Sequence, residues 1–173
     1  MTRYVLLPEE IRAKLHDLTL ENGEMRGMLV YEEINDLGNT ICPIEKLVIL
    51  HRGTSSSARM TETDNRFIRE FISSTNYSFV DSHTHTIGSM RLYGDQVAEQ
   101  FSAGDLAGIS ETQRVNPKYM HLLSTPKKLI LHGIDKPQLL LVTDAKIRKI
   151  IPDYVQRQRC IDEKVMGLLK QGY

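Results

Sequence analysis

The sequence predicts a single domain of the α/β or α+β class, in which a mixed β-sheet is flanked by helices. The chain has 173 residues, which is long enough for one domain with a buried core. Segments with helical periodicity and segments with strand character follow one another along the chain. We find no internal repeat and no long linker, so we assign residues 1–173 to one domain.

The N-terminal part of the chain predicts a helix followed by a β-hairpin. The helix opens at Pro8, whose ring suits a first turn, and ends at Gly23. Strands are expected at Met25–Ile34 and Ile41–Leu50, because both segments are rich in apolar residues. Residues 36–39, which include an Asp, a Gly and an Asn, form the turn between them.

A loop, a helix and a short strand come next. Residues 52–60 contain the run Ser55-Ser56-Ser57, and we expect a mobile loop there. Thr61 and Asp64 have the spacing of a capping box, so a helix with an apolar face begins at Thr61. The apolar segment Tyr77–Val80 predicts a short buried strand.

The C-terminal part predicts a long loop over Thr86–Gln100, which could include one helical turn, and a helix over Ser102–Ser110. Asp144 then caps a final helix that is interrupted near Pro152 and ends near Leu169. Three further strands are expected before that helix, at Met120–Leu123, Lys128–Gly133 and Gln138–Thr143.

Charge, cysteine content and hydropathy exclude several classes of function. Lys plus Arg and Asp plus Glu number 22 each, and this balance argues against nucleic acid or an acidic membrane as the main partner. Cys42 and Cys160 lie far apart, so neither a disulfide framework nor a cysteine zinc ribbon is expected. We find no signal peptide and no apolar run of about 18 residues, so we expect a cytoplasmic protein.

The pair His83-Thr84-His85 is the strongest candidate for chemistry. The two histidines follow an apolar strand and are separated by one residue, so their imidazoles point to the same face. Two imidazoles placed in this way can bind one metal ion.

A carboxylate is needed to complete such a site, and the sequence offers three. Asp105 follows Ser102 by three residues, which is also the spacing of a capping box, and the first turn of a helix would hold it rigidly. Asp81 shares the strand face of the histidines, where it could bind the metal or orient an imidazole. Asp95 is a further alternative.

Three segments together resemble the JAMM (MPN-plus) family of zinc metallopeptidases. The segments are Glu24-Met25-Arg26-Gly27-Met28-Leu29, His83-Thr84-His85 and Phe101-Ser102-Ala103-Gly104-Asp105-Leu106. The family pattern is a Glu before a Gly-x-Leu strand, then His-x-His, then Ser-x-x-Asp, and the order here is the same.

The resemblance implies a strongly curved MPN-type sheet, related to cytidine deaminases, and hydrolysis of peptide or isopeptide bonds. It implies that His83, His85 and Asp105 bind Zn²⁺, that Glu24 is the general base, and that Ser102 donates to the oxyanion. It also implies a substrate in the tail of ubiquitin, a ubiquitin-like protein or a sulfur-carrier protein. Zinc lowers the pKa of bound water to about 7, so a neighbouring carboxylate is a competent base.

The chain differs from the family pattern at three places. Arg26 stands where the family often has a small residue or Cys, and on a regular strand it faces the side of Glu24. A close Arg26–Glu24 pair would lower the pKa of Glu24. Thr86 replaces the usual Pro, and the spacer before Ser102 is longer than usual, so residues 90–100 could be an insertion that contacts substrate.

Other functions remain open at this point. The chain could be a non-catalytic scaffold of the MPN type, or a metal hydrolase that acts on a small molecule. The order Asp81-x-His83-x-His85 also resembles barrel amidohydrolases, but a (β/α)₈ barrel needs about 250 residues, more than the 173 here. The final amphipathic helix leaves open a homodimer, since family members commonly dimerise through helices.

Overall fold

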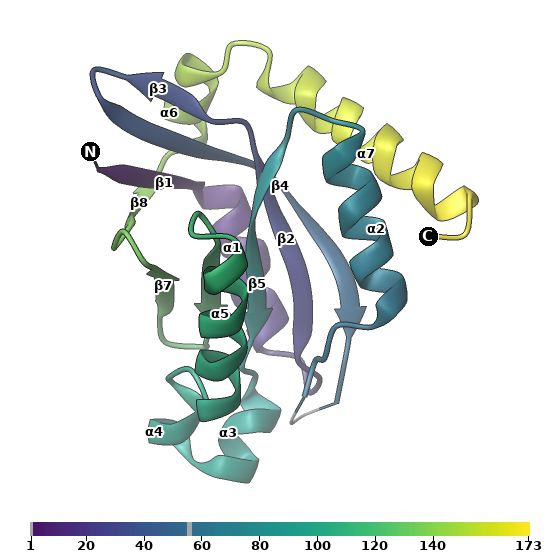
Figure 1. Cartoon of the computed structure of the whole chain (residues 1–173). Coiled ribbons are helices and arrows are strands. Elements are labelled where there is room, and N and C mark those ends of the chain that lie inside the picture. Colours follow the sequence, from purple (N-terminus) through teal and green to yellow (C-terminus); the bar gives the residue numbers. More distant parts are fainter. Residues whose placement is uncertain (1, 55–56) are drawn as a thin grey trace.

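The computed structural model describes residues 2–54 and 57–173 and shows a mixed α/β fold built on one β-sheet (Figure 1). Within these residues the sheet has eight strands in the order β7-β6-β5-β2-β4-β1-β8, with β3 paired to β4. The edge strands β7 and β8 lie on the same side of the molecule in Figure 1, because the sheet curls until it is nearly a barrel.

The strands are β1 (Arg3–Pro8), β2 (Met25–Tyr31), β3 (Ile34–Asp36), β4 (Asn39–Arg52), β5 (Ser78–Thr84), β6 (Met120–Ser124), β7 (Leu129–Gly133) and β8 (Gln138–Val142). The helices are α1 (Glu9–Thr19), α2 (Glu62–Ser73), α3 (Ile87–Tyr93), α4 (Asp95–Ala98), α5 (Ala103–Val115), α6 (Asp144–Ile150) and α7 (Tyr154–Lys170). Strand β2 is antiparallel to β4 and β5, whereas β5 is parallel to β6. The prediction of a mixed sheet with helices around it is therefore confirmed.

Helix α1 covers one face of the sheet. Its buried residues Ile11, Leu15 and Leu18 recur every three or four positions, so they form one apolar stripe. This stripe packs against buried side chains from five strands, β1, β2, β4, β5 and β6. The buried members of this core are Val5, Leu7, Ile11, Leu15, Leu18, Met25, Leu29, Tyr31, Cys42, Ile44, Val80, Met120 and Leu122.

Helices α2 and α7 cover the opposite face over β2 and β4. Phe67 and Phe71 of α2 and Ile161 of α7 are buried there, against Met28 and Val30 of β2. In Figure 1, α5 stands on the other side of β5 from α2. The face of the sheet between α5 and α2 carries the site described below.

Two parts of the fold differ from the sequence prediction. The strand β1 was not predicted, and it is parallel to both β4 and β8, whose residues are distant in the sequence. The expected loop at Thr86–Gln100 contains the helices α3 and α4. Helix α3 begins because Thr86 and Ser89 form a reciprocal capping box, which satisfies amides of its first turn.

The predicted loop at residues 52–60 also contributes to the sheet region. Gly53 donates its amide to the carbonyl of Glu24, and the amide of Glu24 donates to the carbonyl of Thr54. This segment therefore extends the pairing of β2 with β4 by one step and fixes the backbone of Glu24. Ser55 and Ser56 lie outside the described residues.

None of the helices described in the structure combines the length and the hydropathy that a membrane span requires.

Candidate metal centre

His83, His85 and Asp105 converge at the end of β5, as the sequence predicted. Their ligand atoms all lie within 4.8 Å of one another. The two Nε2 atoms are 3.2 Å apart, and Asp105 Oδ2 lies 3.6 Å from His83 Nε2 and 3.7 Å from His85 Nε2. Ligand atoms at about 2.0–2.1 Å from a tetrahedral Zn²⁺ lie roughly 3.3 Å from each other, so these separations fit one ion.

Local structure explains how each ligand is held. Asp81 and His83 alternate on β5 with Val80 and Ser82, so they face α5 while their neighbours face α1. The amide of His85 donates to the carbonyl of Ser124, which continues the pairing of β5 with β6. Asp105 is fixed in the first turn of α5, where its carboxylate accepts the Ser102 amide at 2.8 Å.

The hydrogen bonds of the two imidazoles determine where their lone pairs point. His85 Nδ1 lies 2.8 Å from the carbonyl of Ala98, which can only accept, so Nδ1 carries the proton. Its Nε2 therefore has a free lone pair, directed towards His83 and Asp105. If His83 Nε2 also lacks a proton, the two nitrogen lone pairs and the carboxylate of Asp105 face one another and repel. A cation bound between them would remove this repulsion. The donor set thus fits a divalent metal ion.

The charges of the ligands suit a cation as well. Burial opposes ionisation of Asp105, but hydrogen bonds from Ser102 and, when they are protonated, from His83 and His85 outweigh burial and hold the pKa of Asp105 below its usual range. Burial lowers the pKa of His83, which is 3% exposed, and favours its neutral form. For His85, burial also opposes the charge, but hydrogen bonds with Asp105 and Ala98 outweigh it and raise the pKa, so a metal ion would displace a proton there. Neutral imidazole and carboxylate are the forms that bind zinc.

Glu24 lies in the same cleft, immediately before β2. It is 6% exposed, and its Oε1 accepts a hydrogen bond of 2.7 Å from Ser89 Oγ on α3. Burial raises the pKa of Glu24, and the bond from Ser89 offsets part of this effect. A buried carboxylate with a raised pKa is suited to accept and return a proton near neutral pH.

Arg26 lines the same cleft as Glu24, but the two residues do not form the close pair that the sequence left open. Its guanidinium donates two hydrogen bonds to Asp81, of 3.1 and 2.7 Å, instead of pairing with Glu24. Asp81 lies on β5, the strand next to the one that carries Arg26. A carboxylate that accepts two hydrogen bonds from one guanidinium forms a strong ion pair. The pKa of Glu24 is consequently raised by burial and not lowered by Arg26.

The remaining acidic candidates lie outside the group of three. Asp81 is buried behind His83 and is bonded to Arg26 and Tyr119. Asp95 is at the surface, where it pairs with Lys127 at 2.9 Å. Ser102 lines the cleft, and its hydroxyl donates to Asp105 at 2.6 Å.

Sequence reasoning missed two residues beside the site. His121 had no partner in the local sequence, yet its Nε2 lies 2.7 Å from His83 Nδ1, because β6 is parallel to β5. Ser89 belonged to a predicted loop. The spacing Thr86-x-x-Ser89 could have predicted the start of α3. Nothing in the neighbouring sequence could have predicted that Ser89 bonds to Glu24.

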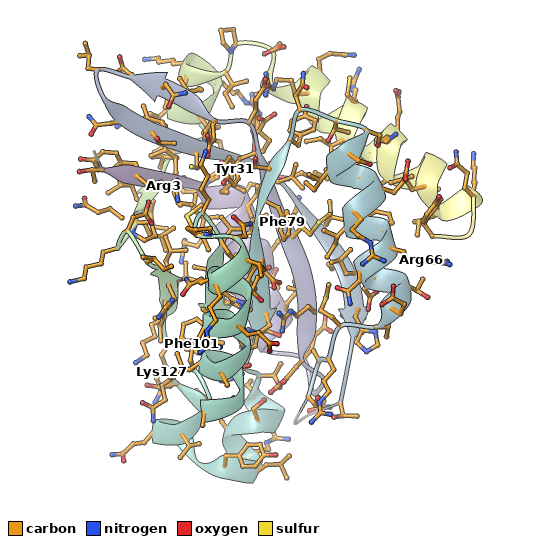
Figure 2. The ribbon with its side chains drawn as sticks, in the orientation of Figure 1. Arg3, Tyr31, Arg66, Phe79, Phe101 and Lys127 are labelled. Atoms are coloured by element: carbon orange, nitrogen blue, oxygen red, sulfur yellow. The ribbon has the colours of Figure 1, made fainter. Side chains whose placement is uncertain are left out.

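The site opens into a cleft of about 810 Å³ between α5 and α2. Glu24, the three metal-ligand candidates and Ser102 line one part of it. The cleft continues past Phe79 to Ile68 of α2. Figure 2 shows Phe79 on β5 and Phe101 beside α5. The ring of Phe101 packs against His83 and His121, with centroids 5.9 and 5.6 Å apart, and helps to exclude water from behind the site.

Comparisons with known proteins identify the fold only. Neither the family models nor the curated proteins include a match to this chain. Among solved structures, the chain is similar to the solution structure of protein DSY2949 from Desulfitobacterium hafniense. The TM-score is 0.51 at 13% sequence identity, and the match covers 81% of this chain and 94% of the other. This likeness concerns the fold.

Proposed function

We propose that this chain is a zinc-dependent hydrolase of peptide or isopeptide bonds, of the JAMM type. The observation that carries the proposal is the buried carboxylate of Glu24 in the same cleft as His83, His85 and Asp105. A three-residue ligand set leaves a position for water or substrate, as catalytic zinc sites require. The sequence order of these four residues, which resembles the JAMM pattern, supports the same conclusion.

Each residue then has a defined task. Zinc supplies Lewis acidity and a bound water of pKa about 7. Glu24 accepts a proton from the attacking water and returns it to the leaving amine. Ser102 turns its hydroxyl from Asp105 to the oxygen of the scissile carbonyl. Losing one such donor typically lowers the rate by about 10²–10³-fold.

The size of the cleft supports a flexible chain as substrate. Its lining includes the metal-ligand candidates as well as Phe79 of β5 and Ile68 of α2, and a volume of about 810 Å³ can accommodate several residues of an extended tail. We therefore propose the C-terminal tail of a ubiquitin-like or sulfur-carrier protein as the substrate. The helix α3, which holds Glu24 through Ser89, belongs to the segment that borders this cleft.

The experiment that tests this function uses zinc-loaded protein and fusions of a reporter peptide to the tails of ubiquitin and of a sulfur-carrier protein. We expect cleavage after the tail, measured by mass spectrometry, and its loss with a chelator. A zinc-loaded protein that cleaves none of the fusions would contradict the proposal and favour the non-catalytic scaffold. Cleavage of small amides alone would favour the small-molecule hydrolase.

Replacing Ser89 by Ala should move the acid limb of the kcat/KM profile to higher pH. Glu24 must be ionised to act as base, and the Ser89 hydrogen bond lowers its pKa. Without this bond the pKa of Glu24 rises further, and a smaller fraction is ionised at a given acidic pH. A hydrogen bond to an ionised group contributes about 1.5–3 kcal/mol, so the rate on this limb should fall about tenfold or more. Ser89→Thr, which keeps a hydroxyl, should retain the original profile.

A further inference from the structure

A continuous line of polar side chains runs from His83 along the wall of the cleft, and its members are Arg26, Asp81, Tyr119 and His121. Arg26 donates to Asp81 through two nitrogens, and Tyr119 bonds to Asp81 Oδ2 at 2.5 Å. The Tyr119 hydroxyl lies 2.9 Å from His121 Nδ1, and His121 Nε2 lies 2.7 Å from His83 Nδ1. Each contact is within hydrogen-bond distance, so the line has no break between Arg26 and the metal-ligand candidate.

The charged pair of Arg26 and Asp81 at one end of this line determines which atom donates in every hydrogen bond along it. A guanidinium can only donate and a carboxylate can only accept, so Tyr119 must donate to Asp81. The Tyr119 oxygen then accepts from His121 Nδ1, which leaves a lone pair on His121 Nε2. That lone pair accepts the proton of His83 Nδ1. The Nε2 of His83 is thereby left without a proton, and it faces His85 and Asp105.

We propose that His121 and Tyr119 are positioning residues for the metal centre, and that they hold His83 in the tautomer whose Nε2 binds the ion. This inference rests on the metal centre of the proposed function. His85 is set in the same tautomer by the carbonyl of Ala98, an independent group on another element. Both imidazoles are thus held in the tautomer that binds the ion by partners other than the ligand candidates themselves.

Burial makes this line effective. His121 is 1% exposed and Asp81 is 6% exposed, so water cannot replace a lost partner. The aromatic ring of Phe101 lies edge-on to His121 with centroids 5.6 Å apart, which restricts its rotation. Outer partners of metal-bound histidines typically contribute 10–100-fold to metal affinity, because they fix the tautomer and the ring orientation.

The test compares His121→Leu with His121→Gln. Leucine removes the acceptor for His83, whereas the glutamine amide offers one acceptor and one donor and can restore both bonds. We expect His121→Leu to weaken Zn²⁺ binding by about 10–100-fold and His121→Gln to remain within a few-fold of the original chain. Affinity is measured by competition with a chromophoric chelator, and Co²⁺ absorption spectra report changes in ligand geometry.

Two further variants keep the result interpretable. Tyr119→Phe keeps the ring and should cause a smaller loss of affinity, because Asp81 Oδ2 lies only 3.6 Å from His121 Nδ1. His132→Leu is the matched control, since His132 also contacts Phe101 but has no bond to a ligand candidate. Its Zn²⁺ affinity should not change.

Several results would overturn the inference. Equal Zn²⁺ affinity in the original chain, His121→Leu and Tyr119→Phe would show that the line does not act on the metal, while leaving the proposed function intact. Equal losses in His121→Leu and His121→Gln would show that packing, and not hydrogen bonding, is responsible. An original chain that binds no metal would remove both the inference and the proposed function.

Discussion

Replacing Glu24 by Gln is expected to stop hydrolysis while the metal stays bound. Glutamine has nearly the same shape and can still accept the hydrogen bond from Ser89, so the cleft should be preserved. It has no basic oxygen to take a proton from water, and general acid–base groups typically contribute about 10²–10⁴-fold to the rate. Steady-state kinetics on the cleaved fusion, together with metal analysis of the same sample, measures both parts of this expectation.

The matched control for this variant is Glu21→Gln. Glu21 lies three residues earlier, at the surface, where it pairs with Arg52. Its replacement should leave both kcat and metal content unchanged. Hydrolysis by Glu24→Gln at the original rate would mean that another group, or none, acts as the base.

Replacing Asp105 by Ala is expected to remove the metal. The variant loses the only carboxylate of the three-residue group, and the two lone pairs of His83 and His85 then face each other without it. Since loss of an outer partner alone weakens metal binding by about 10–100-fold, loss of a ligand should exceed that range. Equilibrium dialysis against buffered Zn²⁺ gives the affinity directly.

This variant also removes a helix cap, and a second variant separates the two effects. Asp105 is the third residue of the capping box that begins at Ser102, and such caps contribute about 0.5–2 kcal/mol. Asp64→Ala removes the equivalent residue from the capping box of α2, which begins at Thr61. We expect Asp64→Ala to lower the free energy of unfolding by an amount similar to Asp105→Ala, while its metal binding stays complete. Full binding by Asp105→Ala would assign the third ligand to another residue.

The parts of the site that the sequence predicted depend on short-range rules. Alternation along a strand places His83 and His85 on one face, and a capping box fixes Asp105 in a helical turn. The glycine of the Gly27-x-Leu29 motif has a different kind of cause, because a Cβ there would lie 2.7 Å from the carbonyl oxygen of Val48 on the neighbouring strand β4. The structure brings the three ligand candidates together.

The parts that the sequence did not predict depend on contacts across the sheet. Arg26 could have turned to Glu24 on its own strand or to Asp81 on the next, and only the pairing of β2 with β5 decides this. His121 becomes a neighbour of His83 through the parallel pairing of β5 with β6. The strand β1 was missed for the same reason, because both of its partners are distant in the sequence.

The central claim is that His83, His85 and Asp105 bind one zinc ion, and X-ray absorption at the zinc edge tests it most directly. The protein is loaded with one equivalent of Zn²⁺ and freed of excess metal. We expect one ion per chain with nitrogen and oxygen ligands at about 2.0–2.1 Å, including the scattering pattern of two imidazoles. A sulfur ligand at about 2.3 Å, which would have to come from Cys42, Cys160 or a methionine, or a protein that retains no zinc, would contradict the account.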